Sequence, residues 1–179
     1  VSQGGFAVGS GAGTFNQVQR ESGFNPKFGI KYALSSDINL FANAAKGFRV
    51  GGANGYSESA CAADRQALGI SAEAARSYRS DSVWSYEAGV KSSLLNGRLI
   101  VNATGFRVEW SNIQQSVALA CGFSIDQNGG HARSEGFELE AQASPAKGLV
   151  LGAGVGYTNA RITDPGALAI LTPGARIQQ

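Results

Sequence analysis

The sequence of 179 residues contains no methionine, one histidine, two cysteines and four prolines. It has no run of 18 apolar residues, so no segment could form a transmembrane helix. The net charge is only +2 and no basic cluster occurs, which argues against a nucleic-acid partner. Because neither an initiator methionine nor a signal peptide is present, we expect Val1 to be a cut point in a longer chain.

No residue pattern typical of an enzyme, a metal site or a cofactor site is present. The single histidine, His131, has no other potential ligand at metal-site spacing, and no Gly-x-Ser-x-Gly nucleophile elbow occurs. The glycines of 152–156 resemble a nucleotide-binding loop only superficially, because Tyr157 stands where the third glycine is required. Glu138 and Glu140 share a predicted strand face, but nothing fixes an acid–base geometry. We therefore predict no catalytic residue, no metal ligand, no cofactor and no enzymatic activity.

The most informative stretch is 83–110, where two long runs are joined by Asn96-Gly97, a pair typical of tight hairpin turns. From 83 to 95 the side chains alternate with a period of two, which indicates a strand. The apolar side holds Trp84, Tyr86, Ala88, Val90 and Leu94, and the polar side holds Ser85, Glu87, Gly89, Lys91 and Ser93. A return strand of 98–110 would reach about 40 Å. A tilted strand needs only about 9–11 residues to cross a bilayer.

Similar alternation predicts six strands in all, near residues 26–34, 38–48, 83–95, 98–111, 131–144 and 149–161. Their connections are alternately short and long, as in an antiparallel up-and-down barrel with short periplasmic turns and long outer loops. Several aromatic residues near the long-loop ends indicate an interfacial girdle: Trp84, Tyr86, Phe106, Trp110 and Tyr157. The predicted fold class is all-β, about six long strands of a larger transmembrane β-barrel. A soluble β-sandwich is the alternative, with shorter strands.

The long connections hold further signals. In the first, an alanine-rich piece over 60–76 has the propensity for a short helix. Cys61 lies in that connection and Cys121 in the second, and two cysteines so placed indicate one disulfide and an oxidising compartment. Two unrelated free thiols are the alternative. We expect the first 25 residues to hold the end of one strand and part of a loop, and residues 162–179 to be irregular.

Five blocks, in order, resemble TonB-dependent outer-membrane receptors over roughly residues 24–162. They are Phe-Asn-Pro-Lys-Phe-Gly-Ile-Lys-Tyr from 24, Leu-Phe-Ala-Asn-Ala-Ala-Lys-Gly-Phe-Arg from 40, Ser-Tyr-Glu-Ala-Gly-Val-Lys from 85, the 102–114 run containing Phe106, Trp110 and Gln114, and the 130–140 run ending in Glu-Leu-Glu. The resemblance implies that 1–179 is part of the C-terminal half of a barrel of about 22 strands. The family's plug domain, TonB-contacting box and terminal aromatic residue have no counterpart in this chain.

The resemblance also implies a function and a location. The parent protein would lie in the outer membrane of a Gram-negative bacterium and import a scarce solute, a ferric siderophore, with energy transmitted by TonB. Its expected partners are outer-membrane lipid, a plug domain of the same chain, TonB acting through that plug, and the solute. Cobalamin, haem and carbohydrates are alternative solutes. A passive porin, a barrel-type adhesin and an outer-membrane barrel enzyme are alternatives of other classes.

Anionic iron chelates favour arginine and aromatic side chains, and five candidate ligand contacts lie in or beside the outer loops: Arg49, Tyr56, Tyr78, Arg79 and Arg133. Surface loops often carry such residues without any ligand, which is the alternative. The polar strand faces carry four further charges, Glu87, Lys91, Glu138 and Glu140. We expect these to line a solvated barrel interior, with a ligand path or a plug contact as the alternative.

Overall fold

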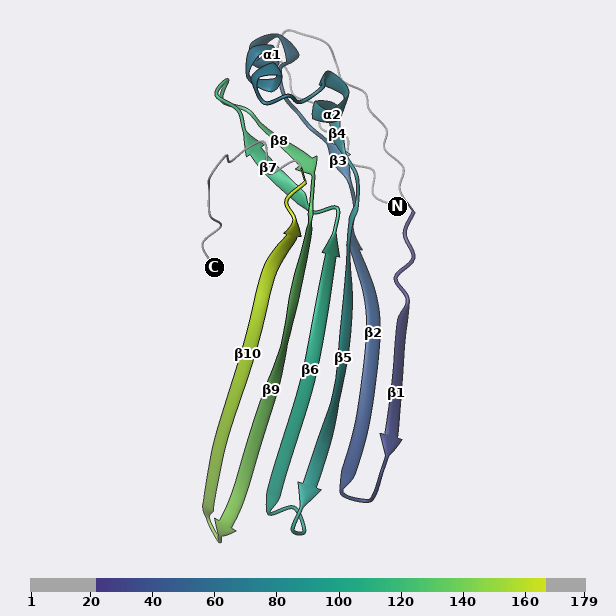
Figure 1. Cartoon of the computed structure of the whole chain (residues 1–179), viewed down its shortest axis with the longest axis vertical. Helices are drawn as coiled ribbons and strands as arrows, with labels where there is room; N and C mark the ends of the chain where they lie inside the picture. Colours follow the sequence, from purple (N-terminus) through teal and green to yellow (C-terminus); the bar gives the residue numbers. More distant parts are fainter. Residues whose placement is uncertain (1–21, 167–179) are drawn as a thin grey trace.

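The computed structural model describes residues 22–166, which form one long antiparallel sheet with a small cap at one end (Figure 1). The predictions for Val1, for most of the first 25 residues and for 167–179 lie outside this range. The sheet order is β1-β2-β5-β6-β9-β10. Its strands are β1 (Lys27–Ala33), β2 (Ile38–Arg49), β5 (Asp81–Leu94), β6 (Leu99–Ser111), β9 (His131–Ala146) and β10 (Leu149–Asp164).

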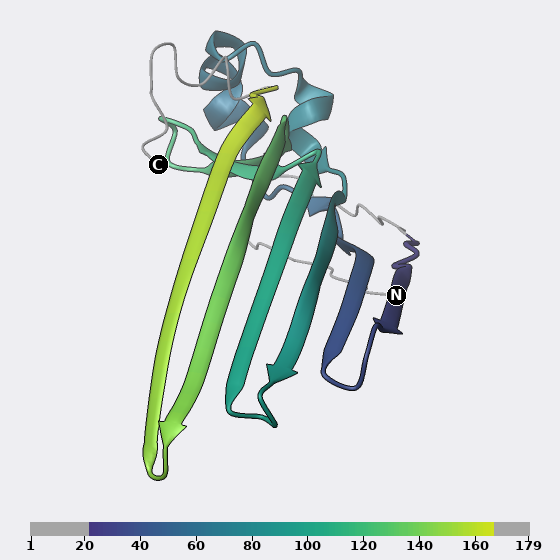
Figure 2. The same ribbon diagram turned by 60° about the horizontal axis from the view of Figure 1, so that its bottom comes forward.

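These six strands match the predicted strands to within three residues at each end, and the predicted fold class is confirmed. β9 and β10 have 16 residues each, about 50 Å of extended chain against about 20 Å for an ordinary strand. Every pair of neighbours is antiparallel. Figure 2 shows the same strands slanting side by side, with the short turns at the end opposite the cap.

The tight turns use left-handed backbone. Gly148 has a φ of 81° between β9 and β10, and Asn96 and Gly97 have φ values of 55° and 81° between β5 and β6. Leu95 is also left-handed, with a φ of 56°. The turn therefore contains four residues, Leu95 to Arg98, one more at each end than the predicted Asn-Gly pair, and β5 ends at Leu94.

The short turns step steadily across the sheet. Ile38 pairs with Ser92, two residues nearer the cap than the Leu94–Leu99 pair, whereas Ala146 lies three residues beyond the pair of Ala143 with Leu99. The β9–β10 turn therefore lies five residues further from the cap than the β1–β2 turn, and the two turns are four strand spacings apart. These shifts correspond to about 17 Å along the strands and about 19 Å across them. The turns lie in one plane only if the strands tilt by about 40°, which is the tilt of barrel strands.

One face of the sheet is apolar over most of its length. Directly opposed residues share a face, and one row of them runs through all six strands: Tyr32, Leu40, Val90, Ala103, Leu139 and Val155. Leu139 is 40% exposed and Leu151, on the same face, is 55% exposed. A water-soluble module would have buried these side chains, so the surface is suited to lipid.

The predicted aromatic girdle needs a correction. Trp84, Tyr86 and Tyr157 lie on the apolar face, but Phe106 pairs with Glu87 and Trp110 with Val83, which places both on the polar face. The period of two divides the side chains of one strand between its two faces. Which face of the next strand lies on the same side of the sheet depends on the length of the turn between them.

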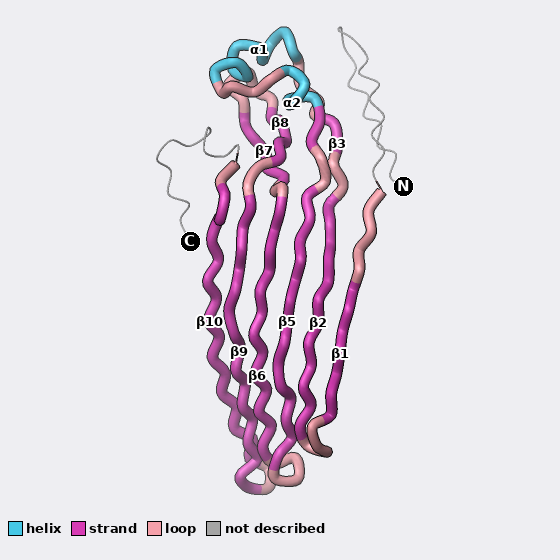
Figure 3. Tube along the Cα trace, turned by 45° about the vertical axis from the view of Figure 1, so that its right-hand side comes forward, coloured by secondary structure: helices cyan, strands magenta, loops and turns pink. Residues whose placement is uncertain are grey.

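The cap contains the remaining elements, all at one end of the sheet (Figure 3). Between β2 and β5 lie β3 (Gly52–Ala53), α1 (Glu58–Ala67), α2 (Ala72–Arg76) and β4 (Ser77–Tyr78), and between β6 and β9 lie β7 (Gln114–Ala118) and β8 (Ser124–Asn128). Neither helix in the described part of the chain is long and apolar enough to cross a membrane.

Candidate functional site

The cap is a folded unit made from two loops that are far apart in sequence. The alanine-rich piece predicted as one short helix forms two, because Gly69 takes a left-handed φ of 67° between them. The side chain of Ser71 then accepts a hydrogen bond from the Ala74 amide at 3.1 Å and caps α2.

Both loops contribute to a small hydrophobic core within the cap. The first loop supplies Tyr56, Cys61, Ile70 and Ala75, and the second supplies Val117, Leu119 and Ile125. Cys61, Ala75 and Ile125 are completely buried. Outer loops that share a core in this way hold one another in place, unlike loops that extend separately into water.

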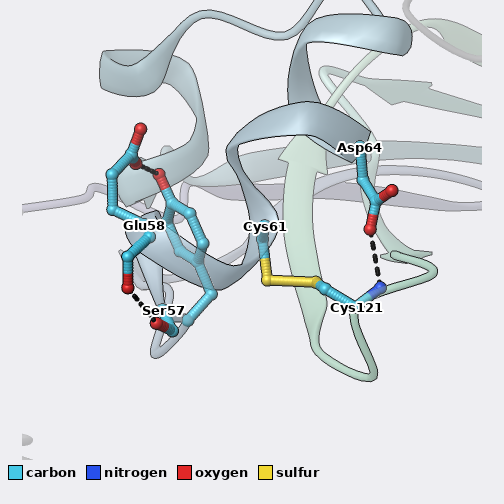
Figure 4. The surroundings of a disulfide bond; sticks show 7 residues. Ser57, Glu58, Cys61, Asp64 and Cys121 are labelled. Carbon is cyan, nitrogen blue, oxygen red and sulfur yellow. Dashed lines mark hydrogen bonds between the residues drawn. A yellow bond between two sulfur atoms is a disulfide. The ribbon is translucent and has the colours of Figure 1, made fainter.

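A disulfide joins the two loops. Figure 4 shows Cys61 of α1 bonded to Cys121, which lies in the turn between β7 and β8. The bonded residues are 60 positions apart with Cα atoms 5.3 Å apart. Beside the bond, the Asp64 carboxylate accepts a hydrogen bond of 2.6 Å from the Cys121 amide. The cross-link therefore connects one outer loop to the next.

Asparagine side chains add polar links between the loops. The Asn54 amide donates to the Asp126 carbonyl at 2.8 Å and accepts from the Asp126 backbone N–H at 2.8 Å. It also donates to the Ala75 carbonyl at 3.0 Å. Two residues further along β8, Asn128 donates to the Arg79 carbonyl at 2.8 Å. Such bonds satisfy loop backbone groups that would otherwise be left without partners.

Asp81 fastens the base of the cap to the sheet. The residue is 2% exposed. Its carboxylate accepts hydrogen bonds from Arg49 Nε at 3.0 and 3.1 Å, from Trp110 Nε1 at 2.9 Å and from the backbone N–H of Gln114 at 3.3 Å. The Arg49 guanidinium lies over the Trp110 ring, 5.1 Å from its centroid. These groups come from β2, β5, β6 and β7, so one buried carboxylate joins three wall strands to the cap. No sequence pattern marked Asp81, because a single Asp between two serines is an ordinary loop feature.

The five predicted ligand contacts lie in different surroundings. Arg49 is held by Asp81, yet its side chain remains 54% exposed. Tyr56 is buried in the cap core and donates a hydrogen bond to Glu58. Tyr78 pairs with Gly52, and Arg79 is exposed, with its backbone bonded to Asn128. Four of the five thus lie in the cap or at its base, but Tyr56 is separated from the others by its burial in the core.

Arg133 does not join them. It lies on the apolar face of β9, opposite Glu109, with which it forms an ion pair of 3.3 Å. The sequence contains a signal for the face on which Arg133 lies, since residues 133 and 137 have the same parity and Phe137 is on the apolar side. The ligand role of all five residues stays a prediction.

Electrostatics within the cap centre on Tyr56 and Glu58. Burial is the main cause that raises the pKa of Tyr56, and its hydrogen bond to Glu58 adds to it. The same hydrogen bond, followed by that from Arg65, holds the pKa of Glu58 below its usual range. Arg65 also donates to the Ile70 carbonyl at 2.6 Å, which ties the end of α1 to the following turn.

The polar face of the sheet carries the charges that the sequence placed there. Glu87 opposes Asn43 and Phe106, Lys91 opposes Asn39 and Asn102, and Glu138 and Glu140 follow on β9. The Lys91 ammonium is 5.5 Å from the centre of the Phe41 ring. Within residues 22–166 no three His, Cys, Asp or Glu side chains gather as a metal site.

Known proteins resemble this chain in sequence and in fold. The family described as "TonB dependent receptor-like, beta-barrel" matches residues 2–177. The metal-pseudopaline receptor CntO of Pseudomonas aeruginosa strain UCBPP-PA14 is 29% identical over 147 residues, which are 82% of this chain and 18% of that receptor.

Solved structures agree in fold. The ferric yersiniabactin uptake receptor FyuA from Yersinia pestis superposes with a TM-score of 0.57 at 18% identity, over 79% of this chain and 19% of that one. The alcaligin outer-membrane receptor FauA from Bordetella pertussis gives 0.53 at 20% identity, over 80% and 23%. The chain thus spans about a fifth of the length of these relatives. This family is one of Gram-negative outer membranes, and the match over nearly the whole sequence shows that the chain belongs to the TonB-dependent receptor β-barrel family.

Proposed function

We propose that the protein containing this chain is an outer-membrane receptor that captures a metal chelate, a ferric siderophore, and imports it with energy from TonB. In this proposal the chain supplies six wall strands and two outer loops. A plug domain elsewhere in the protein fills the barrel and relays the action of TonB. No chemical step is assigned to any residue.

The observation that carries the proposal is the folded cap at the outer end of the sheet. A loop pair with its own buried core, a disulfide and a carboxylate anchor presents a fixed surface, which lowers the entropic cost of binding a small ligand. Arginine at this surface suits an anionic chelate. Three of the relatives are named for metal-pseudopaline, ferric yersiniabactin and alcaligin, and this supports a chelate as the solute class.

Of the predicted contacts, Arg79 and Arg49 are the ones that we propose to meet the ligand, because both side chains are exposed at the cap or its base. Tyr78, beside Arg79 on the same segment, is proposed with them. Tyr56 is enclosed by the cap core, so it acts on the ligand only by shaping the loop. Arg133, on the apolar face, is proposed for a different role below.

Transport by the full-length protein tests the function. Cells expressing it would be given radiolabelled ferric yersiniabactin, ferric alcaligin or a metal–pseudopaline complex, with and without TonB. We expect saturable uptake of one chelate that requires TonB, and about fivefold weaker binding of it in Arg79→Gln. Lys147→Gln, in the short turn at the opposite end of the sheet, is the matched control and should bind as the parent does.

A passive porin or a barrel-type adhesin is the competing function. A porin would let small sugars swell proteoliposomes in proportion to their size, with no saturation and no effect of TonB. An adhesin would bind cells or matrix protein and would not accumulate any chelate. Either result, together with no uptake of any of the three chelates, would overturn the proposal.

A further inference from the structure

A belt of charged side chains crosses the apolar face of the sheet on its cap side. One register row contains Lys46, Trp84, Glu109, Arg133 and Arg161, and the adjacent row towards the short turns contains Arg107 and Glu135. Ion pairs link the belt: Arg107 to Glu109, Arg133 to Glu109 at 3.3 Å, and Arg161 to Glu135 at 3.2 Å. The belt therefore follows several neighbouring strands.

The height of this belt can be worked out from the strand geometry. On β10 the apolar band runs from Leu149 to Tyr157, about 26 Å along the strand and about 20 Å in height at a tilt of about 40°. Barrels of this type have an apolar band about 25 Å tall that ends in aromatic residues. Phe137 and Tyr157 stack with ring centroids 6.0 Å apart and close the band. Glu135 and Arg161 follow two and four residues later, about 5 to 10 Å higher, which is the headgroup region.

The belt has an excess of positive charge. It contains four cations, Lys46, Arg107, Arg133 and Arg161, against two carboxylates, Glu109 and Glu135, which gives a net charge of +2. The Arg107 and Arg161 side chains are each 46% exposed. A guanidinium has five N–H donors, and its ion pair occupies only one or two of its nitrogens here. The remaining donors match phosphate oxygens.

An apolar hollow lies directly below the belt. It has a volume of about 960 Å³ and is lined by Ala88, Phe137 and Tyr157, with Arg107 and Glu135 also among its lining residues. The hollow is open to its surroundings, so it can cover one side of an elongated apolar group. Apolar lining below and guanidinium groups above form an amphipathic site, which matches the two parts of a membrane lipid.

We propose that this face binds an outer-leaflet lipid with an anionic phosphate headgroup. Its phosphate oxygens accept hydrogen bonds from Arg107, Arg133 and Arg161, and an acyl chain lies in the hollow beside Phe137 and Tyr157. The site requires the chain to lie in a membrane, as the proposed function does, but it does not depend on the solute that is transported.

Lipid retention by the full-length receptor tests the site. The purified protein in detergent would be mixed with phosphatidylglycerol, with diacylglycerol of the same chains, or with inorganic phosphate, and bound molecules would be counted by native mass spectrometry. We expect phosphatidylglycerol to bind and diacylglycerol to bind at least tenfold more weakly. Inorganic phosphate should not displace the lipid. Displacement by millimolar phosphate would show a free-anion site and overturn the proposal.

Variants distinguish lipid binding by the belt from a general effect of positive charge on the protein. Arg107→Gln/Arg133→Gln/Arg161→Gln should weaken phosphatidylglycerol binding at least tenfold, and the matching triple lysine variant should retain most of it. Lys27→Gln/Lys31→Gln/Lys91→Gln removes three charges from the polar face and should bind as the parent does. Equal loss in this control, or unchanged binding in the belt variant, would refute the site. If the triple glutamine variant does not fold, Arg161→Gln alone replaces it, and unchanged binding there has the same meaning. No metal chelate is used, so a failure here says nothing about transport.

Discussion

Breaking the Cys61–Cys121 bond should open the cap and leave the sheet intact. When only the cap opens, the strands stay paired, so the loop that the disulfide closes is shorter than the sequence separation of 60. It contains the chain from Cys61 to β5 and from β6 to Cys121, about 30 residues. The chain-entropy relation gives about 3.6 kcal/mol for such a loop at 25 °C. The opening equilibrium of the cap should therefore shift by a few hundredfold.

Hydrogen exchange measured by mass spectrometry on the full-length receptor is the assay. After reduction, amides of 56–75 and 113–128 should exchange about two orders of magnitude faster, while those in β5, β6 and β9 keep their protection. Cys61→Ser/Cys121→Ser should show the fast exchange without reductant and no further change with it. Unchanged protection of the cap on reduction would refute the reasoning, because its core and asparagine links would then suffice alone. Simultaneous loss of protection in the sheet would contradict the cap as a separate unit.

Three further predictions concern the anchor, the lipid face and the acid response of the cap. Asp81→Asn should destabilise the junction between cap and sheet by about 1–3 kcal/mol, since Arg49 loses its counter-charge but stays half exposed. Altered tryptophan fluorescence and faster amide hydrogen exchange near Gln114 would show this, and unaltered exchange would contradict it. Leu139→Arg should cost about 2–4 kcal/mol in urea unfolding from lipid vesicles, whereas Glu138→Arg on the polar face should cost less than about 1 kcal/mol; equal costs would count against the face assignment. Because the pKa of Glu58 is lowered in the folded cap, its ionised carboxylate stabilises the cap at pH values above the ordinary glutamate range. The protection of cap amides from hydrogen exchange should fall as the pH drops through the folded pKa, and it should fall less in Tyr56→Phe. An identical pH response in both proteins would remove Tyr56 as the cause.

Much of the sheet could be predicted because its pattern is local. A period of two over 13 to 16 residues defines β6, β9 and β10 and their apolar sides from neighbouring residues alone. The same parity places Arg133 on the face that carries Phe137, although its position near a loop end favoured a ligand role. The relative faces of β5 and β6 depend on the length of the turn between them, so the period of two alone could not show that Phe106 and Trp110 of the predicted girdle lie on the polar face.

The cap could not be predicted in detail because its contacts are not local. Asn54 bonds Asp126 across 72 positions, and β3 and β4 contain two residues each, too few for any periodic signal. Helix propensity found the alanine-rich segment, but the break at Gly69 and the shared core with Ile125 depend on tertiary packing. Asp81 gained its role only when Arg49, Trp110 and Gln114 met around it.

The lipid-facing assignment of the sheet is tested most directly by accessibility of neighbouring positions on one strand. In a cysteine-free full-length receptor in vesicles, spin labels at residues 138 to 141 would be exposed in turn to oxygen, which partitions into lipid, and to a water-soluble nickel chelate. The labels at 139 and 141 should respond mainly to oxygen, and those at 138 and 140 mainly to nickel. Equal access of the nickel chelate to all four positions would contradict the account.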